Sequence, residues 1–312
     1  PSLLWRLERL VCIYATRADH VVDKILVVWN GPEGVVANAN FSCVRFQSRI
    51  RRKSLWTNST TSMTVEIIEE ERITLLNRYR HSSLASTDAV LLQDDDVFHS
   101  PAALRAFAWM HEAAPLQILG VPPERDYEHR PDAPEKYRYA YIFHPKGGPY
   151  SFLLGQTSVL SRTYLTSFLN HAPRSSLAYI LSNKPTCEDL TLHFHVANAT
   201  GLPPAVFHDL TPTLIHGPRS AQMHSSVSKK LWYKRRERCL ERLVKEFGDT
   251  MPLVKSKCRL AGNFSVSKDP VLSKAYFPLR FQQEDDAAPP RKRRRRNRRK
   301  KKFKAEEQDE ND

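Results

Sequence analysis

The chain has 312 residues, of which 41% are hydrophobic, and its formal net charge is +14 at pH 7. That hydrophobic fraction excludes a chain disordered throughout and is enough for one large domain or two modest ones. No apolar run reaches the roughly 18 residues that a membrane-spanning helix needs, so we expect a soluble body.

The first half of the chain alternates apolar runs with helical patterns. The run Lys24 to Trp29 is β-branched and stops at Asn30-Gly31-Pro32, which favours a buried strand. In chain order, the patterns predict a helix over 3–11, strands over 24–29, 64–68 and 89–92, and helices over 69–80 and 101–112. The segment 38–63 is rich in Asn, Ser, Thr and Arg, and we read it as a loop.

The second half contains two further apolar runs and three helical patterns. The apolar runs are 139–143 and 150–154, and the helical patterns lie near 161–170, 187–197 and 225–247. Strands that alternate with helices predict an α/β fold with a mostly parallel, doubly wound sheet. Ligands of such sheets bind beyond the carboxyl ends of the strands.

Three consecutive carboxylates, Asp94, Asp95 and Asp96, directly follow the strand predicted over 89–92. Like charges at contact distance repel and raise one another's pKa, and a divalent cation would remove that cost. Oxygen ligands suit Mg²⁺ or Mn²⁺, either of which can bridge the phosphates of a nucleotide diphosphate. The alternative is an acidic turn that caps the helix beginning near Pro101.

Two other groups of polar residues are candidates for substrate binding. Asn77 and Arg78 precede the third predicted strand, where Arg can hold a phosphate bidentately, although Arg on a helix is usually solvated surface. Glu188 and Asp189 fall in the first turn of an apolar helix. The helix dipole favours carboxylates there, and the alternative is that one of them is catalytic or holds substrate.

The five cysteines and four sequons bear on the compartment. The cysteines have no short paired spacing of the kind that clusters around zinc. The sequons begin at Asn40, Asn58, Asn198 and Asn263, and they favour a glycoprotein of the secretory pathway.

Lys and Arg occupy every position from Arg291 to Lys304 except Asn297 and Phe303. These twelve cations are largely offset by eight acidic residues around them, so +10 of the +14 net charge lies in the body. A basic body suits an anionic substrate, and equally nucleic acid or solubility. With Phe303 as its one aromatic residue, the segment 282–312 is predicted to be a disordered tail, and no nucleic-acid partner is expected. The rival hypothesis is a basic nucleic-acid-associated protein that acts through this tail.

Seven short segments, in this order, resemble the exostosin-type glycosyltransferase domain, family 64 of the glycosyltransferases. They are VVWNG (27–31), VEIIEEER (65–72), NRY (77–79), TDAVLLQDDD (87–96), YSFLLGQ (150–156), CED (187–189) and RRERC (235–239). The resemblance implies a GT-A fold and a metal-dependent, retaining transfer from a UDP-sugar, usually UDP-N-acetylglucosamine. It also implies a membrane-associated enzyme of the Golgi or endoplasmic reticulum lumen.

Site residues follow from the same resemblance. Asp189 stands at the family's catalytic carboxylate, and Asp96 would be the direct ligand of Mn²⁺ (or Mg²⁺). Cys187 and Cys239 stand on a pair that the family joins by a disulfide. The expected nucleotide-sugar-binding residues are Asn77, Arg78, Asp94, Asp95, Tyr150, Gly155 and Lys229, where Lys229 replaces an arginine of the family.

The resemblance also divides the chain. Residues 1–281 would form the GT-A domain, with a second, acceptor-binding half and with 38–63 as a loop insertion. The family's first strand would precede Ser2, and any membrane anchor would lie further upstream. The expected partners are a UDP-sugar donor and a glycan or glycolipid acceptor. A degenerate, inactive transferase is the remaining alternative.

Overall fold

The computed structural model describes most of the first 260 residues. The described residues are 2–31, 41, 43–50, 53–57, 63–140, 148–182, 186–208, 210, 213–214, 229–257 and 259–260. The tail predicted over 282–312 lies outside them, and so does Cys258. None of the described helices is long and apolar enough to cross a membrane.

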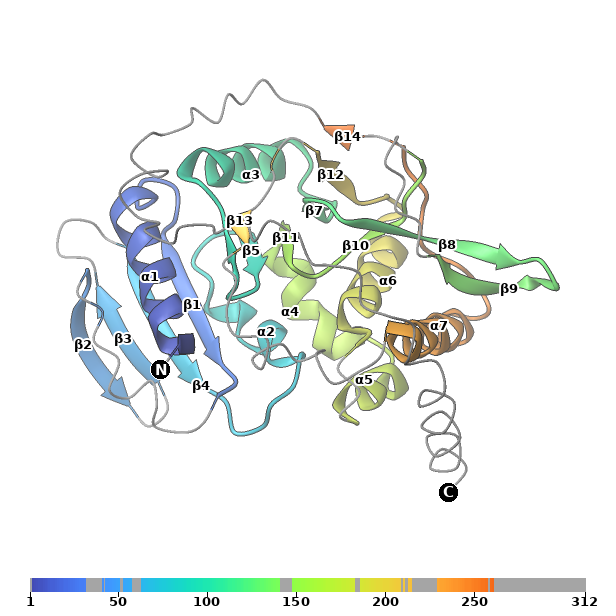
Figure 1. Cartoon of the computed structure of the whole chain (residues 1–312), viewed down its shortest axis with the longest axis horizontal. Helices are drawn as coiled ribbons and strands as arrows, with labels where there is room; N and C mark the ends of the chain where they lie inside the picture. The colour runs from blue at the N-terminus through green and yellow to red at the C-terminus, as the bar shows by residue number, and fades with distance from the viewer. Residues whose placement is uncertain are drawn as a thin grey trace, which may run out of the picture. The chain divides into compact units, whose positions relative to one another are not determined.

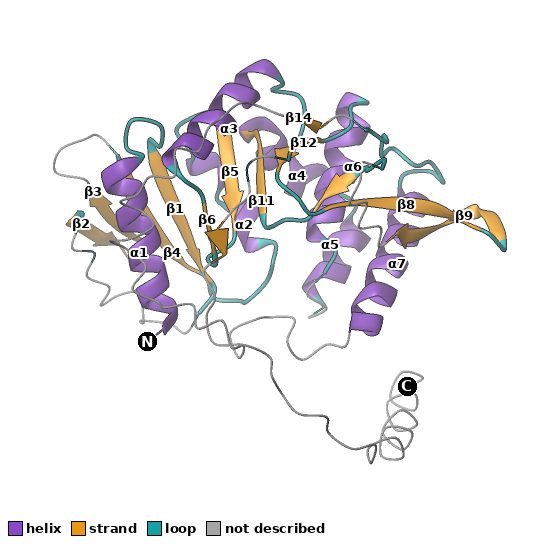
Figure 2. Ribbon diagram, turned by 45° about the horizontal axis from the view of Figure 1, so that its top comes forward, coloured by secondary structure: helices purple, strands orange, loops and turns teal. Residues whose placement is uncertain are grey.

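An N-terminal layer is built from one helix and one sheet. Helix α1 (Ser2–Arg17) lies across a sheet with the strand order β1 (Lys24–Trp29), β4 (Thr64–Glu69), β3 (Lys53–Thr57), β2 (Arg45–Ile50) (Figures 1 and 2). The apolar stripe of α1 is buried against this sheet because its residues recur at helical spacing. The shared core consists of Leu7, Val11, Ala15, Phe41, Val44, Met63, Val65 and Ile67.

The predicted loop over 38–63 is wrong where the structure describes it. Strands β2 and β3 pair with each other antiparallel, and β3 pairs antiparallel with β4. The polar composition was misleading because β2 is an edge strand, and edge strands tolerate charged side chains. A disulfide between Cys12 and Cys43 fastens α1 to the start of this hairpin.

The prediction of a helix over 69–80 is also wrong, because the helix that forms there is much shorter. Glu69 still belongs to β4, which runs parallel to β1, and the Glu70 N–H donates to the Trp29 carbonyl at 3.0 Å. Helix α2 is therefore short, Asn77–Arg80, and a 3₁₀ turn, Ser82–Leu84, follows it. Pairing with β1 overrides the helical propensity of the glutamates, as tertiary context often does.

A second sheet has the strand order β14 (Arg259–Leu260), β12 (Ala205–Phe207), β7 (Leu119–Gly120), β11 (Thr157–Ser161), β5 (Ala89–Gln93). Strand β12 is parallel to both of its neighbours, whereas β11 is antiparallel to both of its own. The α/β class and the parallel pairs are confirmed, but this sheet is mixed rather than mostly parallel. Alternation of strands and helices does not fix direction, and β11 inserts in the opposite sense.

Helices pack around this second sheet. Helix α3 (Pro101–Ala113) begins at Ser100, whose hydroxyl accepts from the Ala103 N–H at 3.2 Å, with Pro101 in the first turn as predicted. The others are α4 (Arg162–His171), α5 (Arg174–Leu181), α6 (Glu188–Thr200) and α7 (Lys229–Glu246). The buried side chains of α4, α6 and α7 share one core cluster.

A hairpin of β8 (Glu124–Arg130) and β9 (Ala133–Ala140) extends from the body beside α7 (Figures 1 and 2). Strand β10 (Phe152–Leu153) pairs antiparallel with β8, and β6 (Val97–Phe98) pairs antiparallel with β13 (Thr213–Leu214). Through β9 and β10, the hairpin region connects α7 with the start of α6.

Candidate functional site

The three aspartates form the turn between β5 and β6. The Asp94 N–H donates to the Gln156 carbonyl at 3.1 Å, and the Val97 N–H donates to the Asp94 carbonyl at 3.3 Å. The three carboxylates have different surroundings in this turn. Asp94 is bonded to Arg78, Asp95 is exposed, and Asp96 is half-buried.

The surroundings of Asp96 disfavour its negative charge, and a bound cation would stabilise that charge. Burial, followed by the negative charges of Asp94 and Asp95, raises the pKa of its carboxyl group. Among the described residues, no group of three or more His, Cys, Asp and Glu side chains could hold a metal ion. The arrangement fits Mg²⁺ or Mn²⁺ bound through one carboxylate, because such ions in phosphate sites take their other ligands from water and substrate oxygens.

Arg78 links the acidic turn to the loop before β11. Its guanidinium donates to an Asp94 carboxylate oxygen and, at 2.8 Å, to the Gly155 carbonyl. A Cβ atom at Gly155 would lie 3.2 Å from Arg78 Nη1 and 3.4 Å from the Asp189 Cβ. Gly155 is therefore the point at which α2, the β10–β11 connection and the start of α6 meet.

Asp189 is buried in an ion pair with Arg236. The guanidinium donates to both carboxylate oxygens, at 2.9 Å to Oδ1 and 3.1 Å to Oδ2. Oδ1 also accepts from the Leu190 N–H at 2.7 Å. Burial opposes ionisation, but Arg236 outweighs it and lowers the pKa of Asp189. The carboxylate therefore stays charged with its orientation fixed on two sides.

Glu188 has the opposite character although it is the adjacent residue. Burial and the charge of Asp189 raise its pKa to about 7, despite the nearby Arg78 and Arg236. The residue is 8% exposed, and Oε2 has no hydrogen-bond partner among the described residues. A buried oxygen without a partner costs about 1–3 kcal/mol, which a ligand hydroxyl group could recover.

We expect a Glu188→Gln variant to change how stability depends on pH. A raised carboxyl pKa means that the folded protein holds a proton that the unfolded chain loses, so wild-type stability should fall as pH rises from about 4.5 to 7. The Gln variant should lack this decline and be more stable above pH 7 by up to about 3 kcal/mol. Denaturant unfolding at several pH values measures it, and parallel curves for the two proteins would contradict it.

Arg236 was not singled out from the sequence. Its guanidinium lies over the rings of Tyr139 and Trp232, at 4.8 and 4.9 Å from the centroids, and is almost fully buried. Lys229, predicted from the resemblance to replace an arginine of the family, begins α7, and its side chain lies outside the described part. The spacing of Arg236 and Cys239 could have indicated this position. Arg236 precedes Cys239 by about one helical turn, so the two residues share a face of α7, and the disulfide joins that face to the start of α6.

Two of the other predicted site residues lie in separate surroundings. The Asn77 side-chain amide donates to Asn30 Oδ1 and to the Arg72 carbonyl, both at 2.6 Å, and its own Oδ1 has no partner among the described residues. The Tyr150 hydroxyl donates to the Pro204 carbonyl at 3.2 Å in the core. The structure thus brings Arg78, Asp94, Gly155 and Asp189 together.

A cavity of about 350 Å³ lies beside Asn77, lined by Glu70, Glu71, Arg72 and Arg80. It does not include Asp189. Arg78 and Glu188 also lie outside its lining, and the pKa values of Glu188 and Asp189 are shifted in opposite directions. Shifted pKa values are common at reactive sites, so this carboxyl pair is a better candidate for chemistry than the cavity.

His193 fixes the start of α6 to β10. Its Nε2 accepts from the Leu153 N–H at 3.1 Å, so its proton is on Nδ1, which donates to the Asp189 carbonyl at 2.8 Å. Burial lowers the pKa of this imidazole to about 4, which keeps it neutral at physiological pH. His193 therefore positions the backbone of Asp189 and holds no mobile proton.

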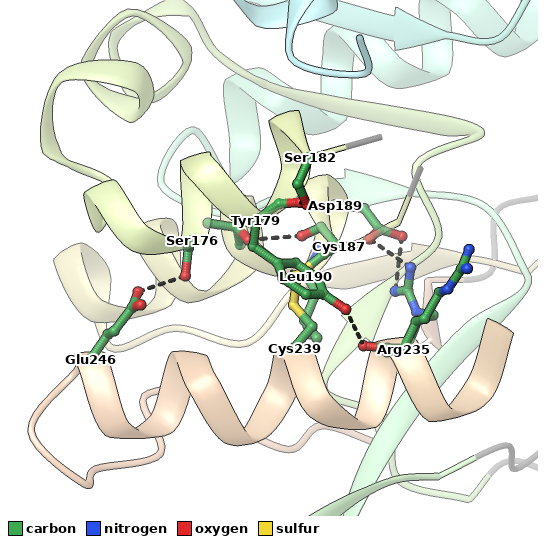
Figure 3. Close-up of a disulfide and its surroundings, with 11 residues drawn as sticks. Ser176, Tyr179, Ser182, Cys187, Asp189, Leu190, Arg235, Cys239 and Glu246 are labelled. Atoms are coloured by element: carbon green, nitrogen blue, oxygen red, sulfur yellow. Dashed lines mark hydrogen bonds and ion pairs between the residues drawn. A yellow bond between two sulfur atoms is a disulfide. The ribbon is translucent and has the colours of Figure 1, made fainter. Parts of the chain in front are cut away.

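The disulfide predicted between Cys187 and Cys239 is present, with Cα atoms 6.2 Å apart and a sequence separation of 52. Figure 3 shows Cys187 and Asp189 at the start of α6, opposite Cys239 and Arg235 of α7. Helix α5 also holds α7, because the Tyr179 hydroxyl donates to the Arg235 carbonyl at 3.3 Å. Cys187, two residues before Asp189, has a backbone φ of 93°, which residues other than glycine rarely adopt.

Removing this disulfide by Cys239→Ser should affect both stability and the site. Closing a loop of this length is worth about 4 kcal/mol by chain entropy, and the loss should also loosen the Asp189–Arg236 geometry and lower turnover. The control is Cys43→Ser, which opens the bond to Cys12. It should cost a similar free energy but leave the turnover of folded protein unchanged. Unfolding curves and kcat for both variants measure this, and equal kcat values would contradict it.

Comparison with known proteins shows which family this chain matches. Residues 5–265 match the family described as Glycosyl transferase family 64 domain. The chain is 27% identical to Glycosylinositol phosphorylceramide mannosyl transferase 1 of Arabidopsis thaliana over 255 residues, which are 80% of this chain and 70% of that protein. It is 25% identical to Exostosin-1b of Danio rerio over 270 residues, 85% of this chain but 31% of that protein. Exostosin-1a of Danio rerio is 27% identical over 217 residues, 68% of this chain and 27% of that protein. The chain thus spans less than a third of these exostosins.

Proposed function

Because the chain belongs to glycosyltransferase family 64, we propose that it transfers a sugar from a nucleotide-diphosphate donor to a glycan or glycolipid acceptor. The observation that carries the proposal is the meeting of two ion pairs at Gly155, one partly buried and one fully buried. One pair, Arg78 with Asp94, adjoins the acidic turn, and the other, Arg236 with Asp189, begins α6. A diphosphate site and a charged carboxylate side by side are what transfer of a sugar from its diphosphate requires.

Arg78 is suited to the diphosphate side. It is partly buried and permanently charged, and Asp94 with the Gly155 carbonyl holds its guanidinium in place. Asp95, exposed beside it, could accept hydrogen bonds from ribose hydroxyls. When bound at Asp96, Mn²⁺ or Mg²⁺ would supply Lewis-acid stabilisation of the negative charge on the departing diphosphate. A UDP donor is our proposal on the family's usual chemistry.

Asp189 and Glu188 are suited to the sugar side. A carboxylate that stays ionised can stabilise the positive charge that develops at the anomeric carbon as the diphosphate leaves. Glu188 has a pKa of about 7 and an oxygen without a partner among the described residues. It can donate a hydrogen bond to a sugar hydroxyl group when protonated and accept one from it when ionised. We propose retention of configuration, either by return of the acceptor on the same face or through a covalent intermediate.

The donor sugar is open to direct measurement. The exostosin resemblance favours N-acetylglucosamine, while one relative is named a mannosyl transferase. Donor turnover across UDP-N-acetylglucosamine, other UDP-sugars and GDP-mannose would identify the sugar, and the anomeric configuration of the product by NMR would test retention. Turnover of none of these donors with Mn²⁺ would contradict the proposal, and an inverted product would refute the retaining mechanism.

We also propose a GT-A fold and residence in the Golgi or endoplasmic reticulum lumen with membrane association. A strand that ends in an acidic turn within an α/β domain supports the fold. Two disulfides support an oxidising compartment. Asn198 of one sequon is exposed on α6, and the other three sequons begin outside the described residues.

A further inference from the structure

A buried arginine lies on the α1 side of the acidic turn. The Arg6 side chain is 6% exposed, and its Nη2 lies 3.6 Å from Oδ2 of Asp95, whose side chain is 60% exposed. The Arg6 Nε has no hydrogen-bond partner among the described residues. Burying a charged group costs free energy, and a buried N–H without a hydrogen-bond partner adds to that cost. A buried arginine of this kind therefore suggests a functional role.

Two arginines therefore lie at the turn with its three aspartates, the buried Arg6 and the partly buried Arg78. Arg78 is bonded to Asp94 and Arg6 faces Asp95, which leaves Asp96 as the carboxylate without an arginine of its own in these ion pairs. The five side chains together have one negative charge. A bare divalent cation would turn this set positive, whereas a cation that arrives with the two negative charges of a sugar-nucleotide diphosphate leaves its charge unchanged.

Building on the proposed nucleotide-sugar site, we propose that Arg6 makes the acidic turn bind a divalent cation together with a diphosphate rather than alone. The fixed charge of Arg6 repels a bare cation at the turn and attracts the diphosphate, and both effects are enlarged by the low dielectric around a buried side chain. Arg6 thus acts as a specificity-determining residue for the cation–diphosphate complex. In this role, Arg6 prevents Mn²⁺ from occupying the site unproductively.

Mn²⁺ binding to the full chain, followed by the loss of the free-Mn²⁺ EPR signal with and without UDP, tests the proposal. The substitution is Arg6→Gln. Without UDP, the variant should bind Mn²⁺ about 10-fold more tightly than wild type because a repelling charge is gone. With saturating Mn²⁺, it should bind UDP about 10-fold more weakly, so the combined affinity for Mn²⁺ and UDP is unchanged and the preference for the pair over bare Mn²⁺ falls about 10-fold.

Two matched variants separate charge from structure. Arg6→Lys keeps the charge and should bind bare Mn²⁺ as weakly as wild type, and it remains informative if Arg6→Gln does not fold. Arg9→Gln removes a charge from the same helix, where Arg9 lies 5.3 Å over the Trp5 ring, and should leave both affinities unchanged.

The outcomes are distinct. Weaker binding of bare Mn²⁺ by Arg6→Gln would mean that Arg6 merely supports the turn, and unchanged affinities would mean that it has no part in the site. Either result would overturn the proposal while leaving the transferase function standing. A wild-type protein that binds neither Mn²⁺ nor UDP would overturn the proposed function itself, and the role of Arg6 with it.

Discussion

Replacing Asp189 with asparagine should lower turnover by about 100-fold or more, equivalent to about 2.7 kcal/mol of barrier, while UDP binding survives. The change keeps the size of the side chain but removes the charge that faces the proposed sugar position. Binding should survive because the diphosphate side depends on Arg78, Asp94 and Asp96, which belong to other elements.

The same substitution should also destabilise the fold, and this effect must be separated from the chemistry. Breaking a buried ion pair leaves Arg236 without its counter-ion, at a cost of about 3–5 kcal/mol. The double variant Asp189→Asn with Arg236→Gln removes both charges and should recover part of the stability without recovering turnover. Kinetics, UDP affinity and melting temperature of the single and double variants provide the measurement.

The result that would contradict a chemical role is wild-type turnover in a folded Asp189→Asn variant. Asp189 would then serve the structure alone, through its buried ion pair with Arg236 at the start of α6, and Glu188 would be the next candidate. Turnover that recovers in the double variant would likewise assign the loss to the unpaired Arg236 and not to missing catalysis.

The second large effect is expected for Asp96→Ala, which should abolish transfer and the Mn²⁺-dependent stabilisation by UDP. Asp96 is half-buried beside two other carboxylates, and its raised pKa reflects burial followed by their repulsion. In the absence of a cation, the variant should be no less stable than wild type, because the substitution removes a negative charge that burial and two neighbouring carboxylates disfavour. Activity assays and melting curves with and without UDP and Mn²⁺ measure both parts.

Asp95→Asn is the matched control for Asp96→Ala. It removes a carboxylate from the same turn, but from an exposed position, so Mn²⁺-dependent stabilisation by UDP should persist although reduced. Tight, Mn²⁺-dependent UDP binding by Asp96→Ala would refute the assignment of Asp96 as the metal ligand.

Local sequence signals predicted the elements whose pattern agrees with their packing. The predicted strand over 24–29 is β1, and the helix predicted to begin at Pro101 is α3. The hairpin of β2 and β3 was missed because a polar edge strand resembles a loop in composition. Strand direction was missed because β11 is set by tertiary packing and not by its own residues.

The site was only partly readable from sequence for a similar reason. Arg78, Asp94 and Asp189 stood in recognisable segments, but nothing local shows that Gly155 brings them together. The buried position of Glu188 and the pairing of Arg236 with Asp189 depend on α6 and α7 meeting across the disulfide. Such partners are set by contacts between residues roughly 50 positions apart, which neither periodicity nor composition encodes.

We propose that this site binds a nucleotide diphosphate through a divalent cation. The most direct test is the melting temperature of the wild-type chain with UDP, Mn²⁺, both together, or both with a chelator. UDP and Mn²⁺ together should raise it by roughly 5 °C or more when UDP is about 100-fold above its Kd, and neither alone should do so. A melting temperature that does not move with UDP or GDP in the presence of Mn²⁺ or Mg²⁺ would contradict the account.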